Sequence, residues 1–356
     1  MSDRSKQIQA FIIESVSQHP HDLTNHIANH FQISPQAVLK HLKKLVEAGH
    51  LHKEGTTRNI SYSLPAPRRE SSPVSTPSGW VVASKDWSFS IGPELDEQDI
   101  WEQTLKTKFQ HLRENVRDIV EYGFTEMVNN VKDHANAKHL TVSYEITDET
   151  LRVEVRDDGV GIFRKIRESL GLSTLREAIL HLSKGKLTTD HTRHTGEGIF
   201  FSSRVFDKYF LSANGLMYGR INEMADEDWL IGEEKETNQG TRVSMSIALN
   251  SPRTREEVFR KFTSSEDFSF SKTHVAVELG MIDGETYVSR SQAKRIMSRL
   301  DKFRFIVLNF KRVKTVGQGF VDEVFRVYKN AHPDIQIDYV NANESVEFMI
   351  RRSLVE

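Results

Sequence analysis

Three short stretches in the middle of the chain decide its fold: Glu126-Met-Val-Asn-Asn130, Asp157-Asp-Gly-Val-Gly161 and Gly196-Glu-Gly-Ile199. The first places a carboxylate and a carboxamide one helical turn apart, on one face of a helix. The second places an acid at the end of a predicted strand and follows it with two glycines. The third is a glycine turn that enters a predicted helix, where backbone N–H groups suit phosphate oxygens. This order of strand, acid and glycines is the one that a nucleotide pocket requires.

The sequence around these stretches predicts alternating helices and strands. A long helix runs from Asp99 into Glu126, and strands follow at residues 140–146 and 151–156. A later strand at residues 239–247 is entered through Gly240 and Thr241.

In their order and separation, the three stretches resemble the N, G1 and G2 boxes of the GHKL ATPase superfamily, which includes gyrase and the histidine kinases. The resemblance implies a Bergerat α/β sandwich that binds ATP and Mg²⁺. It implies that Glu126 polarises the attacking water or hydroxyl and that Asn130 binds Mg²⁺ through its carbonyl oxygen. It also implies that Asp157 accepts a hydrogen bond from the adenine amino group, with Thr241 helping to hold that aspartate.

The same resemblance assigns the remaining site residues. Gly159 and Gly161 let the backbone approach the base and ribose, and Gly196 and Gly198 do so for the phosphates. His134 matches a histidine common in anti-sigma-factor kinases, where it is expected near the phosphates. Residues 162–195 are the expected ATP lid. Asp133, beside His134, is also assigned to the nucleotide. The lid contains five basic residues that are expected to reach the γ-phosphate when the lid closes: Lys184, Lys186, His191, Arg193 and His194.

Bulk composition sets limits on the class of protein. The chain has 356 residues, a net charge of −2 and no cysteine, which excludes disulfides and thiol catalysis. No apolar run approaches the ~20 residues of a membrane span, and the N-terminus lacks the apolar region of a secretory signal. We therefore expect a cytoplasmic protein without a membrane partner.

The sequence predicts an α+β multidomain chain. Residues 65–79 are rich in proline, serine and charge, and they are expected to form an extended linker. A softer boundary lies near residues 250–271, where a charged helix is predicted. The expected domains are residues 1–64, residues 80–250, which hold the ATPase-like boxes, and residues 268–356.

Residues 1–64 show three helical patterns followed by two alternating stretches that predict a β-hairpin. Ser34-Pro35 marks the start of the third helix, which ends before Gly49. This order resembles a winged helix-turn-helix of bacterial transcription regulators. The resemblance implies DNA as a partner, and winged helices commonly pair to read two half-sites, so a homodimer is one arrangement it allows. The residues that it assigns to DNA are Gln36, Lys40, His41, Lys43 and Lys44 on the third helix and Lys53 and Arg58 on the wing. A winged helix that binds protein or dimerises is the alternative.

Residues 268–356 alternate predicted strands and helices, with a fully apolar strand at residues 305–310 that is expected to be central. This segment resembles a STAS-like α/β domain of unknown function that often follows an ATPase of this type in bacteria. STAS domains are antagonists and substrates of anti-sigma kinases, phosphorylated on a serine or threonine at the start of a helix. The corresponding loop here, residues 315–319, lacks the serine and offers only Thr315.

Three functions remain open from the sequence. The first is an ATP-binding, ATP-hydrolysing regulator that couples the nucleotide state to DNA binding or to a protein partner. The second is a protein serine/threonine kinase of the anti-sigma type, acting on a STAS-like or other protein, or on Thr315. The third is a binding module without turnover.

Overall fold

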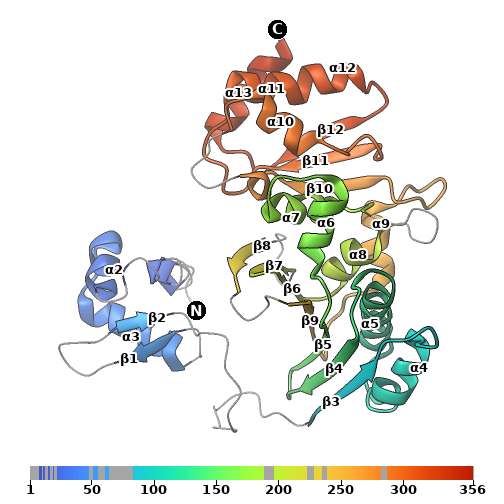
Figure 1. The fold of residues 1–356 in the computed structure, drawn as a ribbon. Coiled ribbons are helices and arrows are strands. Elements are labelled where there is room, and N and C mark those ends of the chain that lie inside the picture. The colour runs from blue at the N-terminus through green and yellow to red at the C-terminus, as the bar shows by residue number, and fades with distance from the viewer. Residues whose placement is uncertain are drawn as a thin grey trace. The chain divides into compact units, whose positions relative to one another are not determined.

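The structure is a computed structural model of the chain. It describes residues 8–9, 11–12, 15–16, 19, 22–47, 51–54, 61–63, 83–187, 196–222, 228–234, 239–281 and 287–355. The chain divides into two compact units, Met1–Ser75 and Thr76–Glu356 (Figure 1). The division falls within the predicted linker, whose residues 65–79 lie outside the described part of the chain.

The first unit contains helices α2 (Leu23–Phe31) and α3 (Pro35–Glu47) and the antiparallel strands β1 (His52–Glu54) and β2 (Ser61–Ser63). The Ala37 N–H donates to Ser34 Oγ (3.2 Å) ahead of Pro35, so the predicted Ser-Pro start of α3 is present. Residues spaced three and four apart on α2 and α3 face a separate hydrophobic core. Its buried members are Ile8, Ile12, Val16, Leu23, Ile27, Ala28, Val38, Leu42, Leu45, Leu51 and Tyr62.

The second unit is built on a seven-stranded sheet in which all neighbouring strands are antiparallel. In spatial order its strands are β3 (Ala83–Ser90), β4 (His139–Ile146), β5 (Thr150–Asp157), β9 (Thr241–Ala248), β6 (Lys208–Ala213), β7 (Leu216–Ile221) and β8 (Asp228–Glu233). Burial alternates along β4, β5 and β9, so one face of the sheet carries the core.

Helices cover that face of the sheet. In α5 the buried positions, from Val116 to Val131, recur every three or four residues, and this stripe packs against β5 and β9. The helices of this part are α4 (Glu97–Trp101), the π-helix η1 (Glu102–Lys106), α5 (Glu114–His134), α6 (Ile162–Leu170), α7 (Leu175–Lys184), α8 (Gly198–Val205) and α9 (Arg255–Phe262).

The prediction of a long helix from Asp99 to Glu126 is wrong in one respect, because the helix is interrupted at residues 107–113. Arg113 has extended backbone (ψ 143°), and α5 starts afresh after it. The interruption brings the buried Phe109 edge-on to Tyr144 of β4, with ring centroids 5.4 Å apart. Burial of this aromatic ring favours the break over a continuous helix.

The C-terminal part is a parallel three-stranded sheet of β10 (Lys272–Ala276), β11 (Phe305–Asn309) and β12 (Gln336–Val340). The apolar strand β11 lies in the middle, as predicted, and Ile306 and Leu308 are fully buried. Ser289 caps α10 in a capping box with Gln292. The other elements are η2 (Val277–Gly280), α10 (Arg290–Met297), α11 (Gln318–Asp322), η3 (Glu323–Tyr328), α12 (Lys329–Ala331) and α13 (Glu344–Val355).

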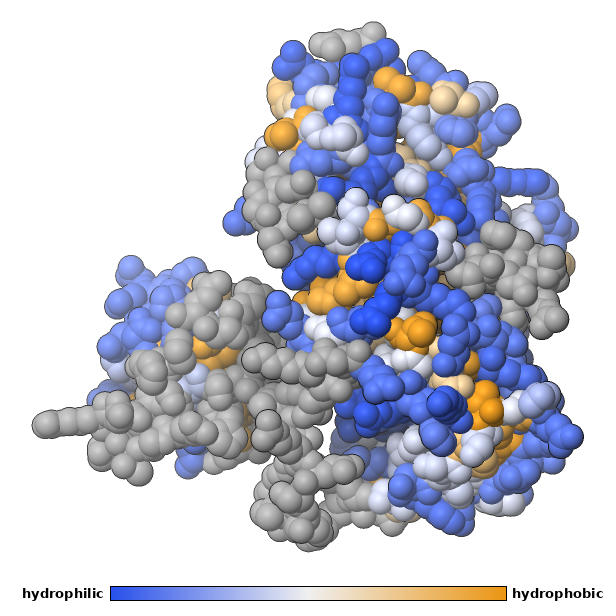
Figure 2. Space-filling view, in the orientation of Figure 1, coloured by the Kyte–Doolittle hydropathy of each residue, from blue (hydrophilic) through white to orange (hydrophobic). Residues whose placement is uncertain are grey.

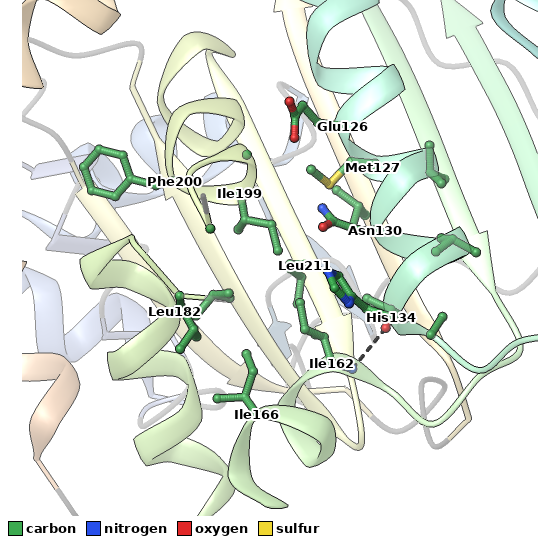
Figure 3. Close-up of a pocket in the computed structure, with 18 of the residues that line it drawn as sticks. Glu126, Met127, Asn130, His134, Ile162, Ile166, Leu182, Ile199, Phe200 and Leu211 are labelled. Carbon is green, nitrogen blue, oxygen red and sulfur yellow. Dashed lines mark hydrogen bonds between the residues drawn. The ribbon is translucent and has the colours of Figure 1, made fainter. Parts of the chain in front are cut away.

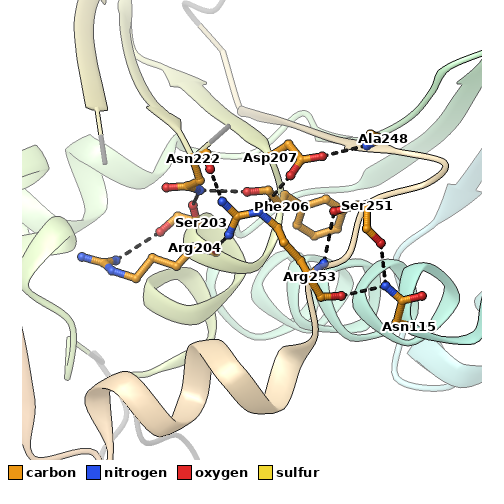
Figure 4. Close-up of polar contacts among 9 residues, drawn as sticks. All are labelled: Asn115, Ser203, Arg204, Phe206, Asp207, Asn222, Ala248, Ser251 and Arg253. Atoms are coloured by element: carbon orange, nitrogen blue, oxygen red, sulfur yellow. Dashed lines mark hydrogen bonds and ion pairs between the residues drawn. The ribbon is translucent and has the colours of Figure 1, made fainter. Parts of the chain in front are cut away.

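Arg253 fixes the segment that connects the two parts of the second unit (Figure 4). Its Nε pairs with Asp207 Oδ1 (2.9 Å), and its guanidinium also donates to the carbonyls of Arg204 and Asn222. Asn115 of α5 donates to the carbonyls of Ser251 (2.8 Å) and Arg253 (2.7 Å). The segment is therefore held to α5, α8 and the start of β6.

Among the described residues, no helix combines the length and the apolar character needed to cross a membrane. The face seen in Figure 2 is mainly hydrophilic, and its hydrophobic residues lie in small separate groups.

Candidate functional site

A cavity of about 410 Å³ lies between the sheet and the helices of the second unit. Its walls come from α5, β5, α6, α7, α8 and β9, with Leu211 of β6 and Phe259 of α9 (Figure 3). Apolar side chains make up much of the lining, and the polar groups come mainly from the three stretches that open the sequence analysis. This combination is typical of a small-molecule site.

Three residues of α5 face the cavity one turn apart: Glu126, Asn130 and His134 (Figure 3). The helical spacing of four residues aligns them on one side of α5, as the sequence predicts. Asn130 has a buried amide nitrogen with no hydrogen-bond partner among the described residues. A buried amide of this kind is available to a ligand.

Glu126 lies close to the start of α8. A Cβ built on Gly198 would be only 2.0 Å from Glu126 Oε2, so a larger residue there would displace the Glu126 carboxylate. The partial positive charge of the α8 N-terminus favours a carboxylate at this place.

Asp157 ends β5 and is 4% exposed. Its Oδ1 accepts from the Gly159 N–H (2.8 Å), and Thr241 also hydrogen bonds to this carboxyl. Burial raises the pKa of Asp157 to about 6, although these hydrogen bonds act to lower it. The Thr241 hydroxyl also accepts from the Ile162 N–H (3.1 Å), which ties the start of α6 to β9.

Two glycine turns frame the cavity. Gly161 has φ +81°, and a Cβ there would meet the Asn214 side chain at 2.4 Å. Gly196 has φ +72°, and its carbonyl accepts from the Leu187 N–H (3.2 Å). Both positions require glycine, and Gly161, Gly196 and Gly198 all line the cavity.

The cavity thus brings together Glu126, Asn130, His134, Asp157, Gly161, Gly196, Gly198 and Thr241. Asp133 is exposed and lies outside the lining. Gly159 also lies outside it and holds Asp157 instead; a Cβ there would meet the Ala135 carbonyl oxygen at 2.1 Å. Arg193, with His191 and His194, falls outside the described residues.

The structure corrects the expectation that Lys184 and Lys186 point to the nucleotide. The Lys184 ammonium donates to the carbonyls of Ser298 (3.0 Å) and Arg295 (3.3 Å), and Lys186 donates to that of Lys302 (2.7 Å). Both side chains therefore contact the C-terminal part: Lys184 binds carbonyls at the end of α10, which attract a cation as phosphates do, and Lys186 binds a carbonyl of the turn that follows.

Two residues that shape the site were not predicted from the sequence. Lys165 of α6 lines the cavity and donates to the His134 carbonyl; burial lowers its pKa. Asn214 holds the G1 loop, since it donates to the Val160 carbonyl and accepts from the Arg164 N–H, both at 3.0 Å. The only signal for Lys165 was its position four residues after Gly161, and for Asn214 its Asn-Gly turn.

In the first unit, α3 presents one polar face. Gln36, Lys40, Lys43 and Lys44 are exposed on it, and Lys53 is exposed on β1. His41 is half-buried, and burial followed by the charge of Lys44 lowers its pKa. Arg58 lies outside the described residues.

Comparison with known families agrees with this geometry. Residues 99–217 match the histidine kinase-like ATPase domain, and residues 292–347 match a STAS-like domain of unknown function. No curated protein matches the chain. The middle of the chain is therefore a histidine kinase-like ATPase domain, a class that supports nucleotide binding, and it is followed by a STAS-like domain. The predicted resemblance is confirmed for these two parts, whereas the winged helix-turn-helix stays a prediction.

Proposed function

We propose that the protein is an ATP-binding and ATP-hydrolysing regulator whose nucleotide state controls DNA binding or a protein partner. The main support is that one cavity of a histidine kinase-like ATPase domain is lined by Glu126 and Asn130 of α5, Asp157 of β5 and the Gly196–Gly198 turn.

The base would lie at Asp157. An ionised, buried carboxylate fixed by Gly159 and Thr241 accepts a hydrogen bond from the amino group of adenine. A base with a carbonyl oxygen in that place would bring two hydrogen-bond acceptors, the oxygen and the Asp157 carboxylate, into an unfavourable contact. The site would therefore select adenine.

The phosphates would lie between α5 and the start of α8. Mg²⁺ prefers hard oxygen ligands and keeps several waters, and the described residues offer no cluster of three His, Asp or Glu for an all-protein site. The Asn130 amide, whose oxygen and nitrogen are interchangeable by rotation, suits a metal that phosphates and water complete. Bound Mg²⁺ would neutralise charge on the phosphates. Glu126, lined up with Asn130, would orient and deprotonate the attacking water.

DNA binding is supported by the first unit alone. Its exposed α3 residues, Gln36, Lys40, Lys43 and Lys44, form the kind of polar, basic face that a recognition helix offers to the major groove. A helix of this kind that binds protein instead is the alternative.

Calorimetric titration of the full chain with ATP and MgCl₂ tests the pocket. We expect binding by the wild type, binding without phosphate release by Glu126→Ala, and loss of adenine selectivity in Asp157→Ala. Absence of ATP binding by the folded wild type would overturn the proposal. For the regulatory part, equal DNA affinity with and without Mg·ATP would count against coupling.

A protein kinase of the anti-sigma type is the second candidate, favoured by the STAS-like domain and by the exposed Thr315 in the loop before α11. It predicts that label from the γ-phosphate of ATP appears on protein, whereas an ATPase releases it as free phosphate. Thr315→Val separates transfer to the chain itself from transfer to another protein.

A further inference from the structure

The short stretch Ser183–Lys186, here called the latch, connects the cavity to the STAS-like domain. Leu182 and Leu187, on either side of it, line the cavity. Between them, Lys184 contacts β10 and the end of α10 instead. A few residues of chain therefore touch both the candidate nucleotide site and the STAS-like domain.

Lys184 makes the central contact of the latch. It is 2% exposed, and its ammonium donates to the Ser298 and Arg295 carbonyls, at 3.0 and 3.3 Å. These carbonyls lie at the C-terminus of α10, where the last turn lacks intrahelical partners and carries partial negative charge. A lysine from the ATPase domain thus caps a helix of the STAS-like domain.

Neighbouring contacts strengthen this connection. The Thr273 hydroxyl of β10 donates to the Lys184 carbonyl (2.7 Å), at the end of α7. The Lys186 ammonium, bonded to Lys302, also lies over the rings of Phe303 (4.8 Å) and Phe270 (5.6 Å). Each domain thus supplies polar partners to the end of a helix in the other.

On its other side the latch and the adjoining Leu187 contact α8 and the Gly196–Gly198 turn. Gly185 has φ +81°, and a Cβ there would be 2.8 Å from Phe200 of α8. Arg204 of α8 reaches the Ser183 carbonyl at 3.5 Å, and Leu187 donates to Gly196 (3.2 Å). A displacement of the latch would therefore move the Gly196–Gly198 turn.

Stability alone does not account for a buried lysine here. Among the described residues the electrostatic partner that shifts the Lys184 pKa is Arg299 and not a carboxylate, and burying an ammonium on carbonyls alone costs free energy that an apolar side chain would avoid. Burial, and then the charge of Arg299, lower the pKa of Lys184 to about 7. Charged or neutral, the amino group has N–H donors for both carbonyls, so what it supplies is a directional link to α10.

We propose that Lys184 is a positioning residue through which the STAS-like domain sets the nucleotide affinity of the ATPase domain. The inference rests on the proposed nucleotide site. By linkage, nucleotide binding stabilises the contact between Lys184 and the end of α10 by the same free energy with which that contact strengthens nucleotide binding.

The test compares ATP and MgCl₂ titrations of the full chain with those of three variants. Lys184→Met keeps the length of the side chain and removes the ammonium. Thr273→Val removes only the hydroxyl that bonds to the latch from the STAS-like side. Lys294→Met, on the exposed face of α10, is the matched control. We expect affinity to weaken about 10-fold in Lys184→Met, less in Thr273→Val and not in the control.

Hydrogen exchange without nucleotide gives a second readout. Residues 196–205 are expected to exchange faster in Lys184→Met and Thr273→Val than in the wild type. A wild type that fails to bind ATP overturns the proposed function, and the exchange data then still test the latch. Folded variants that lose only thermal stability, with unchanged ATP affinity and unchanged exchange at 196–205, overturn the inference. If Lys184→Met does not fold, Thr273→Val decides.

Discussion

At the scale of the residue, Asp157 gives the site a pH dependence. Its pKa is about 6 in the folded chain against 3.8 for the ordinary side chain, so the folded state holds more protons between these values. Its contribution to folding stability is therefore complete below pH 3.8 and is lost as the pH rises through about 6. In the proposed function, nucleotide binding has the opposite pH dependence: it is favoured at higher pH, because the adenine amino group would donate to the ionised carboxylate.

We therefore predict that ATP affinity rises between pH 5 and pH 7 with a midpoint near 6, which titrations at several pH values would measure. In Asp157→Asn, binding should be weaker and should lack this midpoint. A wild-type affinity that is flat over this range would contradict the role of Asp157.

Gly198 supports a second prediction. Ala in a helix is intrinsically better than Gly by about 1 kcal/mol, so Gly198→Ala would stabilise α8 if space allowed. The added methyl group would instead lie 2.0 Å from Glu126 Oε2 and displace that carboxylate. We expect phosphate release to fall about 10-fold or more, with ATP still bound. Gly92→Ala, which meets nothing within 4 Å, is the control and should retain activity.

The residues of the site were predictable where short motifs carry the chemistry. Glu126, Asn130 and Asp157 follow from the resemblance of short motifs, in their order and separation, to the boxes of the GHKL superfamily, and all line the cavity. Lys165 and Asn214 were not predicted because their roles depend on contacts with residues far away in the sequence. The separation is 31 positions for Lys165 and 54 positions for Asn214. Local patterns do not encode such contacts.

At the scale of the element, the expected lid shows that residue type alone does not determine which group a basic side chain binds. A run of basic residues in 184–194 suits phosphates, and it suits helix C-termini equally. The structure shows α7 buried from Ala178 to Lys184 and packed on β10 and η2, so the first two of these basic residues serve the domain contact. Only the tertiary fold distinguishes the two uses.

Helix α3 supports a prediction on DNA. Lys40, Lys43 and Lys44 are exposed on one element. If they contact phosphates, replacing each by alanine should weaken binding to all sequences and lower the salt slope by about 1 per lysine. Fluorescence anisotropy at several salt concentrations measures this, with the exposed Lys108→Ala as control. An unchanged slope in the triple variant would point to a protein partner for α3.

At the scale of the whole molecule, the boundary predicted at residues 250–271 does not separate two independent bodies. Trp229 of β8 donates to Glu278 (2.8 Å), and Arg312 bonds both to Glu278 (2.7 Å) and to the Trp229 carbonyl (2.9 Å). The ATPase and STAS-like domains thus share one compact unit. Composition marks the connecting segment, but it carries no information about these distant pairings.

Arg253 tests how far this unit depends on its connecting segment. Arg253→Ala removes a guanidinium that bonds to Asp207 and to two carbonyls, and it leaves the poorly exposed Asp207 without this partner (Figure 4). We expect the free energy of unfolding to fall by about 2–3 kcal/mol, measured by urea denaturation. Arg260→Ala, whose pair with Glu256 is 72% and 78% exposed, should cost less than about 1 kcal/mol. Equal effects of both changes would exclude a special role for the connecting segment.

The cap that Lys184 forms has a consequence for biosynthesis. The ribosome makes the ATPase segment before Thr273, Arg295 and Ser298, which supply the partners of the latch. Domains of a nascent chain generally fold in the order of their synthesis, but here Lys184 of the earlier domain has its partners in the later one. A chain that has not yet reached Ser298 therefore leaves the Lys184 side chain without its carbonyl partners, and this contact between the two domains forms only after residue 298 has been made.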